Sequence, residues 1–111
     1  MKIVQALKVK LSPSERQGIA SVGTTDLEAH QNFMRMRSYL FYPGMDAQHW
    51  RQAIQFGERA IQQDPNYAQA HAVLSLMHLL DFHNGWSGDD SAVAMEKAKN
   101  LSDQAYALGP D

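Results

Sequence analysis

The sequence predicts an all-α fold made of antiparallel helical hairpins, and three observations support this prediction. Two stretches have similar sequences, and each predicts a helix. They are residues 51–65 (RQAIQFGERAIQQDP) and residues 96–110 (EKAKNLSDQAYALGP). Their shared residues lie 45 positions apart and are Ala53 and Ala98, Ala60 and Ala105, and Pro65 and Pro110. Apolar residues recur at helical spacing elsewhere, and no apolar-polar alternation is long enough for a strand. A fixed period with small residues on one helical face predicts stacked helical hairpins.

Two short helices are expected in residues 1–24, ahead of the hairpins. Ile3, Leu7 and Leu11 lie four positions apart and form one apolar stripe on a helix. Residues 12–15 (SPSE) then combine an N-cap serine, a proline suited to the first helical position and a capping-box glutamate. This combination starts a second short helix, which Gly23 is expected to end.

Residues 25–65 are predicted to form the first hairpin. Residues 25–28 (TDLE) match a capping box and open a helix that extends to Phe41, before Pro43 and Gly44 stop it. Asp46 is expected to cap the second helix of this hairpin, because an aspartate side chain can accept the free N–H groups of the first turn. That helix should end at residues 64–65 (DP).

Residues 66–111 are predicted to form the second hairpin, which has a long connection between its helices. Asn66 is expected to cap a helix from Tyr67 to about residue 83. Residues 84–90 (NGWSGDD) are rich in turn-forming residues and predict an exposed loop, with its tryptophan packed back on the hairpin or used as a contact. The last helix should span residues 91–108 after a cap by Asp90, with Gly109 as a left-handed stop.

Length and composition exclude several classes of protein. At 111 residues the chain is one domain at most. A net charge of −2, with the basic residues dispersed, argues against nucleic acid as a partner. The absence of cysteine excludes disulfides and thiolate chemistry. No apolar run approaches the roughly 20 residues that span a bilayer, and no signal-peptide cleavage site is recognised, so we expect no membrane contact and a cytoplasmic location.

The candidate chemical sites favour packing and capping over catalysis. His71 and His78 lie two helical turns apart, whereas metal-binding pairs on a helix are spaced by three or four and need a third ligand. Asp89 and Asp90 lack the alternating oxygen ligands of a calcium loop. No serine follows a strand in a nucleophile-elbow motif. We therefore predict no catalytic residue, no cofactor and no metal.

The chain resembles tetratricopeptide repeat proteins, whose unit is a helix pair with the pattern W-x2-L-G-x2-Y, then A-x3-F, then P. In the second hairpin the matching positions are occupied by His71, Leu74, Ser75, His78, Ala98, Ala105 and Pro110. In the first hairpin they are occupied by Asn32, Arg35, Met36, Tyr39, Ala53, Ala60 and Pro65. In both hairpins the large second-helix residue, Phe56 or Leu101, falls one place early.

A further resemblance concerns the proteins to which such repeats are attached. The long hairpin loop, the DPNYAQAH junction at residues 64–71 and the leader at residues 3–30 are similar to the repeat region of bacterial class III adenylate or guanylate cyclases. This resemblance implies a non-catalytic interaction or scaffolding module from a larger signalling protein. Related regions in winged-helix proteins leave a second hypothesis, an effector-sensing or oligomerisation repeat domain of a bacterial transcriptional regulator. A small metal-dependent enzyme is the third and would require bound metal.

The resemblance also implies a partner-binding groove on the first helix of each hairpin. Aligning the hairpins on Met36 and Ser75 assigns this groove to His30, Phe33, Arg37, Leu40, Gln69, Ala72, Leu76 and Leu79. A mostly apolar groove suits a protein or peptide partner that presents an amphipathic helix, including the chain's own residues 1–11. The last helix carries more apolar side chains than one helix contact requires, so we also expect a homodimer.

Overall fold

The computed structural model describes residues 23–109, and every regular element in this part of the chain is helical. The elements are α3 (Leu27–Ser38), a 3-10 turn η1 (Tyr39–Phe41), α4 (Ala47–Gln63), α5 (Ala68–Asn84) and α6 (Ser91–Leu108). The predicted all-α fold is therefore confirmed. The two short leading helices expected in residues 1–24 lie almost entirely outside the described residues.

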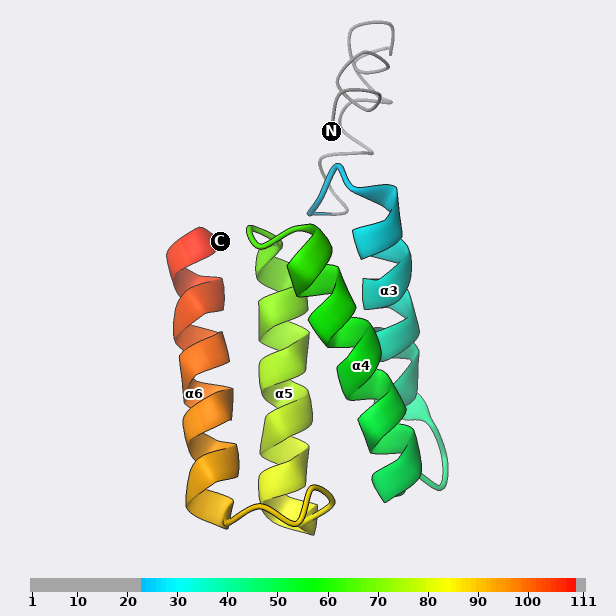
Figure 1. Ribbon diagram of the computed structural model, residues 1–111, viewed down its shortest axis with the longest axis vertical. Helices are drawn as coiled ribbons and strands as arrows, with labels where there is room; N and C mark the ends of the chain where they lie inside the picture. Colours follow the sequence, from blue (N-terminus) through cyan, green and yellow to red (C-terminus); the bar gives the residue numbers. More distant parts are fainter. Residues whose placement is uncertain (1–22, 110–111) are drawn as a thin grey trace, which may run out of the picture.

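The four α-helices lie side by side and alternate in direction (Figure 1). Helix α3 packs mainly on α4, and α5 packs mainly on α6, while α4 also contacts α5 and joins the two pairs. This arrangement is two antiparallel hairpins stacked through α4 and α5. It agrees with the predicted hairpin order and is consistent with tetratricopeptide packing.

Three aspartates cap helices, and two of them, Asp46 and Asp90, are the predicted caps. The Asp26 and Asp46 carboxylates accept the backbone N–H groups of Ala29 and His49 at 3.0 and 2.9 Å. Asp90 accepts the N–H group of Ala92 at 3.0 Å. The Asp46 and Asp90 caps are therefore confirmed, and Asp26 supplies the cap within the predicted TDLE box. These caps are readable from sequence because each involves residues two or three apart.

The junction between the hairpins differs from the prediction at Asn66. Asp64 Oδ1 accepts the Asn66 N–H at 3.1 Å, and Asp64 also accepts a hydrogen bond from the buried Thr24 hydroxyl. Tyr67 occupies the N-cap position of α5 and makes no side-chain capping bond. The entry to α5 is thus set by the turn at Asp64 and by the burial of the Tyr67 side chain, not by Asn66.

The end of α6 also differs from the prediction. Gly109 has φ −163° and ψ 86°, an extended conformation and not the expected left-handed one. A Cβ atom at Gly109 would lie 3.4 Å from Ala68 Cβ, so the end of α6 passes close to the start of α5. The left-handed stop instead occurs at Gly85, with φ 68°, after an α5 that continues one residue beyond the predicted end.

The core lies between α3, α4 and α5. Its buried members are Ala29, Phe33, Met36, Trp50, Ala53, Ile54, Ala60, Tyr67, Ala70, Leu74 and Met77. Trp50 Nε1 donates to the backbone oxygen of Met77 at 2.8 Å and ties α4 to α5. Ser75 Oγ donates to the backbone oxygen of Ala98 at 2.6 Å, so this small residue lies where α5 and α6 approach closely, as predicted.

The loop at residues 85–90 is held against the helices at two points. The Asp81 side chain is only 3% exposed and accepts both the backbone N–H and the hydroxyl of Ser87, each at 2.7 Å. Arg51 Nη2 donates to the Trp86 carbonyl oxygen at 3.1 Å, and the Trp86 side chain packs against the core. Of the two predicted positions for this tryptophan, the structure has the one packed back on the hairpins.

Candidate functional site: the groove between α4 and α6

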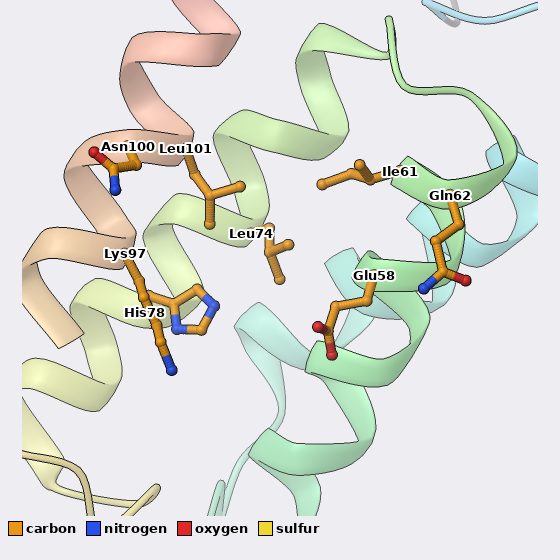
Figure 2. Close-up of a pocket in the computed structure, with 8 residues that line it drawn as sticks. All are labelled: Glu58, Ile61, Gln62, Leu74, His78, Lys97, Asn100 and Leu101. Carbon is orange, nitrogen blue, oxygen red and sulfur yellow. The ribbon is translucent and has the colours of Figure 1, made fainter. Parts of the chain in front are cut away.

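A groove of about 390 Å³ runs between α4 and α6 and has α5 as its floor (Figure 2). We call it the α4–α6 groove. The residues that line it are Glu58, Ile61 and Gln62 from α4, Leu74 and His78 from α5, and Lys97, Asn100 and Leu101 from α6. Because both hairpins contribute, the groove exists only once they are stacked.

The floor of the groove is apolar and its walls are polar. Leu74 is 3% exposed, and Ile61 and Leu101 are partly buried against the core. Glu58 on one wall and Lys97 on the other carry opposite charges. Lys97 Nζ lies 3.2 Å from Asp89 Oδ2, whereas no ion pair among residues 23–109 involves Glu58. The apolar floor can bury a partner's side chain, and the walls can orient it.

His78 is the titratable group closest to the core in this groove. Its ring stands edge-on to the Trp50 ring, with centroids 5.9 Å apart and an interplanar angle of 81°. Burial lowers the pKa of His78 below 6.5, and the nearby Lys97 charge lowers it further, against the opposing effect of Asp81 and Asp89. His78 Nδ1 is buried and has no hydrogen-bond partner within the described structure. A neutral imidazole therefore contributes one polar atom beside an otherwise apolar floor.

The residues assigned to the first-helix groove do not line the α4–α6 groove. Phe33 is 5% exposed because the Tyr67 ring covers it at a centroid distance of 5.1 Å, so it is a core residue and the assignment of Phe33 to an open surface is wrong. His30 lies beside the same pair, with Nδ1 3.4 Å from the Tyr67 hydroxyl. The sequence alignment could not show that a residue 34 positions further along the chain covers Phe33.

The other assigned residues are spread over α3, η1 and α5. Arg37, Gln69, Ala72 and Leu76 are exposed, while Leu40 and Leu79 are partly buried. The structure brings Gln69 and Ala72 together in a smaller pocket between α5 and α6. Sequence reasoning missed the α4–α6 groove because it considered only first-helix residues. Three of the lining residues, Leu74, His78 and Leu101, had been identified by the repeat alignment, but as packing positions of the hairpin and not as parts of a groove.

Two further observations bear on the chemistry of the molecule. Within residues 23–109, no group of three or more His, Asp or Glu side chains is placed to hold a metal ion. In the same range, none of the helices has the length and apolar character that a membrane span requires.

Comparison with known proteins gives one similar relative. The chain matches no model of a protein family, and no solved structure matches it. It is 37% identical over 87 residues to Putative adenylate cyclase 3 of Rhizobium meliloti (strain 1021). The match covers 78% of this chain and 14% of that protein, so the chain spans a small part of the relative's length. The similarity supports the predicted association with cyclase proteins, whereas the assignment to tetratricopeptide repeats remains a prediction.

Proposed function

We propose that this chain is a non-catalytic protein-interaction segment of tetratricopeptide type within a larger, cytoplasmic adenylate or guanylate cyclase-like signalling protein. The similarity to a protein named as an adenylate cyclase supports the cyclase part of this proposal. The observation that carries the interaction role is the α4–α6 groove, which two stacked hairpins form and which has a buried apolar floor.

The groove would act by offering a preformed surface. A partner that inserts an apolar side chain over Leu74 and Leu101 gains affinity from apolar area removed from water. Glu58 and Lys97 on opposite walls would favour a partner of complementary charge order. The partner proposed here is a protein or peptide that presents an amphipathic helix. The first-helix surface that carries Arg37, Gln69 and Leu76 is a second proposed contact region.

Self-association forms the second part of the proposal. Four large apolar side chains on α5 and α6 are substantially exposed, namely Leu76 at 41%, Val93 at 41%, Met95 at 39% and Tyr106 at 71%. Apolar surface of this kind is commonly covered in a two-fold dimer. We therefore propose a homodimer that buries at least about 1,200 Å² in total and includes α6.

Sedimentation equilibrium at micromolar concentration tests the dimer. We expect twice the 12.5 kDa mass of one chain, and Tyr106→Glu together with Met95→Glu should shift the equilibrium toward the monomer. Leu27→Glu is the matched control, because Leu27 is 65% exposed on α3, far from α6 in the helix order. A purified chain that sediments as a monomer at micromolar concentration would contradict self-association.

A cyclase assay tests the non-catalytic part of the proposal. The purified chain with ATP or GTP and either Mg²⁺ or Mn²⁺ is expected to form no cyclic nucleotide. If the chain forms cyclic nucleotide and His78→Gln abolishes this activity, the α4–α6 groove is catalytic and this part of the proposal is contradicted.

A further inference from the structure

A pocket with several aromatic side chains lies on the first hairpin, beside the turn that joins α3 to α4. Its volume is about 440 Å³, which falls within the range of about 300 to 1,000 Å³ that small-molecule sites occupy. We call it the aromatic pocket. The side chains that define it come from α3, from η1 and its C-terminal end, and from α4, and they are Arg35, Tyr39, Tyr42, His49, Gln52 and Phe56.

The rings of the aromatic pocket form two contacting pairs. The Tyr39 ring stacks on the Phe56 ring with centroids 6.5 Å apart and an interplanar angle of 25°, and both side chains pack against the core. The Tyr42 ring lies 4.6 Å from the His49 ring and 6.0 Å from the Tyr39 ring, between centroids. Because the core holds Tyr39 and Phe56, this surface is formed before a ligand arrives, and a planar ring can stack on it.

Two arginines place positive charge beside these rings. The guanidinium carbons of Arg35 and Arg59 lie 5.6 and 6.0 Å from the centroid of the Phe56 ring. Among residues 23–109, neither arginine forms an ion pair, and the nearby Asp46 is paired with His49 at 2.7 Å. A guanidinium that stacks on a ring keeps N–H donors for an anion. The aromatic pocket therefore combines a surface for a planar ring with two cationic groups that can bind an anion.

The equivalent face of the second hairpin has a different chemistry. The repeat alignment relates Arg35 and Phe56 to Leu74 and Leu101, which line the α4–α6 groove. Leu74 is 3% exposed beneath that groove, whereas Arg35 is exposed. An apolar helix packed over Arg35 would remove water from its charge without replacing it. The aromatic pocket is thus suited to a charged ligand and not to a packed helix.

Polar groups beside the rings can bind the edge of a heteroaromatic ligand. The Tyr39 hydroxyl donates to Gln52 Oε1 at 3.0 Å, so the amide N–H groups of Gln52 remain as donors. His49 Nδ1 lies 2.7 Å from Asp46 Oδ1, and its Nε2 atom remains for another partner. A purely hydrocarbon ring could not bond to these groups. A nucleobase has nitrogen and oxygen atoms at its edge and a planar face for stacking.

We propose that the aromatic pocket binds a nucleoside monophosphate, with the base stacked on the aromatic rings and the phosphate held by Arg35 and Arg59. A phosphate monoester carries a charge of about −1.5 to −2 at neutral pH, which two arginines balance, whereas a carboxylate carries a single charge. Arginine also binds phosphate oxygens through two parallel hydrogen bonds. The aromatic pocket shares no lining residue with the α4–α6 groove, so this inference does not depend on partner binding there.

Isothermal titration calorimetry of the full chain with AMP, GMP, CMP and UMP tests this proposal. The corresponding nucleosides and inorganic phosphate are matched probes, since each lacks one half of the ligand. We expect at least one nucleotide to bind at least about tenfold more tightly than its nucleoside and than inorganic phosphate, because the stacked base and the charged contacts each contribute roughly tenfold or more. The proposal is wrong if all four nucleotides fall short of this difference, whether because none binds or because inorganic phosphate binds as tightly.

Two substitutions with neighbouring controls locate the ligand. Arg35→Gln should weaken nucleotide binding at least about tenfold, whereas Arg37→Gln should not, because Arg37 is also exposed on α3 but does not line the pocket. Tyr42→Ser should weaken binding by a similar factor, whereas Phe41→Ser, at a position that is 82% exposed and outside the pocket, should not. Thermal unfolding of each variant checks that the fold is retained. Equal weakening by Arg35→Gln and Arg37→Gln would show that general surface charge holds the ligand and would overturn the proposed site.

Discussion

The Met36 side chain on α3 fills the space that a side chain at Gly57 on α4 would need. A Cβ atom at Gly57 would overlap Met36 Sδ and lie 3.0 Å from Leu74 Cδ1, so three helices meet at this glycine. Met36 is fully buried and occupies the first-helix position where the repeat pattern expects a small residue. The small residue is Gly57, on the α4 side of the contact. Because the large Met36 side chain faces this glycine, the first hairpin packs although it departs from the repeat pattern.

Gly57→Ala should therefore destabilise the protein in the presence of Met36. A helix-interior alanine normally gains up to about 1 kcal/mol over glycine, but overpacking a core typically costs about 1 to 3 kcal/mol. We expect a net loss in urea unfolding. In a Met36→Ala background the same change should be neutral or stabilising. A double-mutant cycle with a coupling energy below about 0.5 kcal/mol would show that the two residues do not compete for this space.

Ala60 and Ala105 occupy equivalent repeat positions but differ in burial. Ala60 is 0% exposed, whereas Ala105 is partly exposed and lines the smaller pocket between α5 and α6. Ala60→Leu should cost about 1 to 3 kcal/mol by overpacking. Ala105→Leu should cost less, because the added atoms can enter the pocket. Urea melts of the two variants compare them directly, and equal losses would contradict the difference in packing.

Asp81 is expected to control the 85–90 loop. Asp81→Ala leaves the partly buried N–H and hydroxyl groups of Ser87 without their acceptor, which should cost about 1 to 3 kcal/mol. Limited proteolysis should cut first within this loop, and faster in the variant. Asp89→Ala is the control, because its exposed pair with Lys97 contributes little. First cleavage inside α5 would mean that the loop is not the weakest segment.

Acid should weaken the packing around His78. Because the folded-state pKa of His78 lies below its ordinary value of 6.5, the unfolded chain binds the proton first as pH falls. The free energy of unfolding should thus be highest above pH 6.5 and decline as pH falls through and below that value. His78→Gln should flatten this dependence, whereas His83→Gln, at an exposed position, should not. Denaturant titrations between pH 5 and 8 measure the slope.

Alkali should act through Tyr67. Burial, reinforced by the Asp64 charge and opposed by Arg37, raises the pKa of Tyr67 from 10.0 to about 12. The unfolded chain loses this proton first, so stability is complete below pH 10 and declines as pH rises toward 12. The loss should approach about 2 to 3 kcal/mol. Tyr67→Phe should lack this decline, while Tyr106→Phe should retain it.

The sequence by itself determined the helical class, the order of the hairpins and the caps by Asp46 and Asp90. These features depend on apolar spacing within a helix or on side chains that bind N–H groups two or three residues away. The repeat pattern also placed Ser75 at the close contact with α6, because that contact recurs in each hairpin.

Only the tertiary structure decided which surfaces are open. Phe33 was assigned to a groove, but Tyr67 covers it from the next hairpin, and the burial of Tyr67 also replaces the expected Asn66 cap. The α4–α6 groove combines Glu58 with Lys97 and Leu101 across two hairpins, and neither repeat encodes it alone. Burial and grooves depend on contacts between residues distant in the chain, whose pairing follows from packing volumes such as the Met36 and Gly57 exchange and not from local pattern.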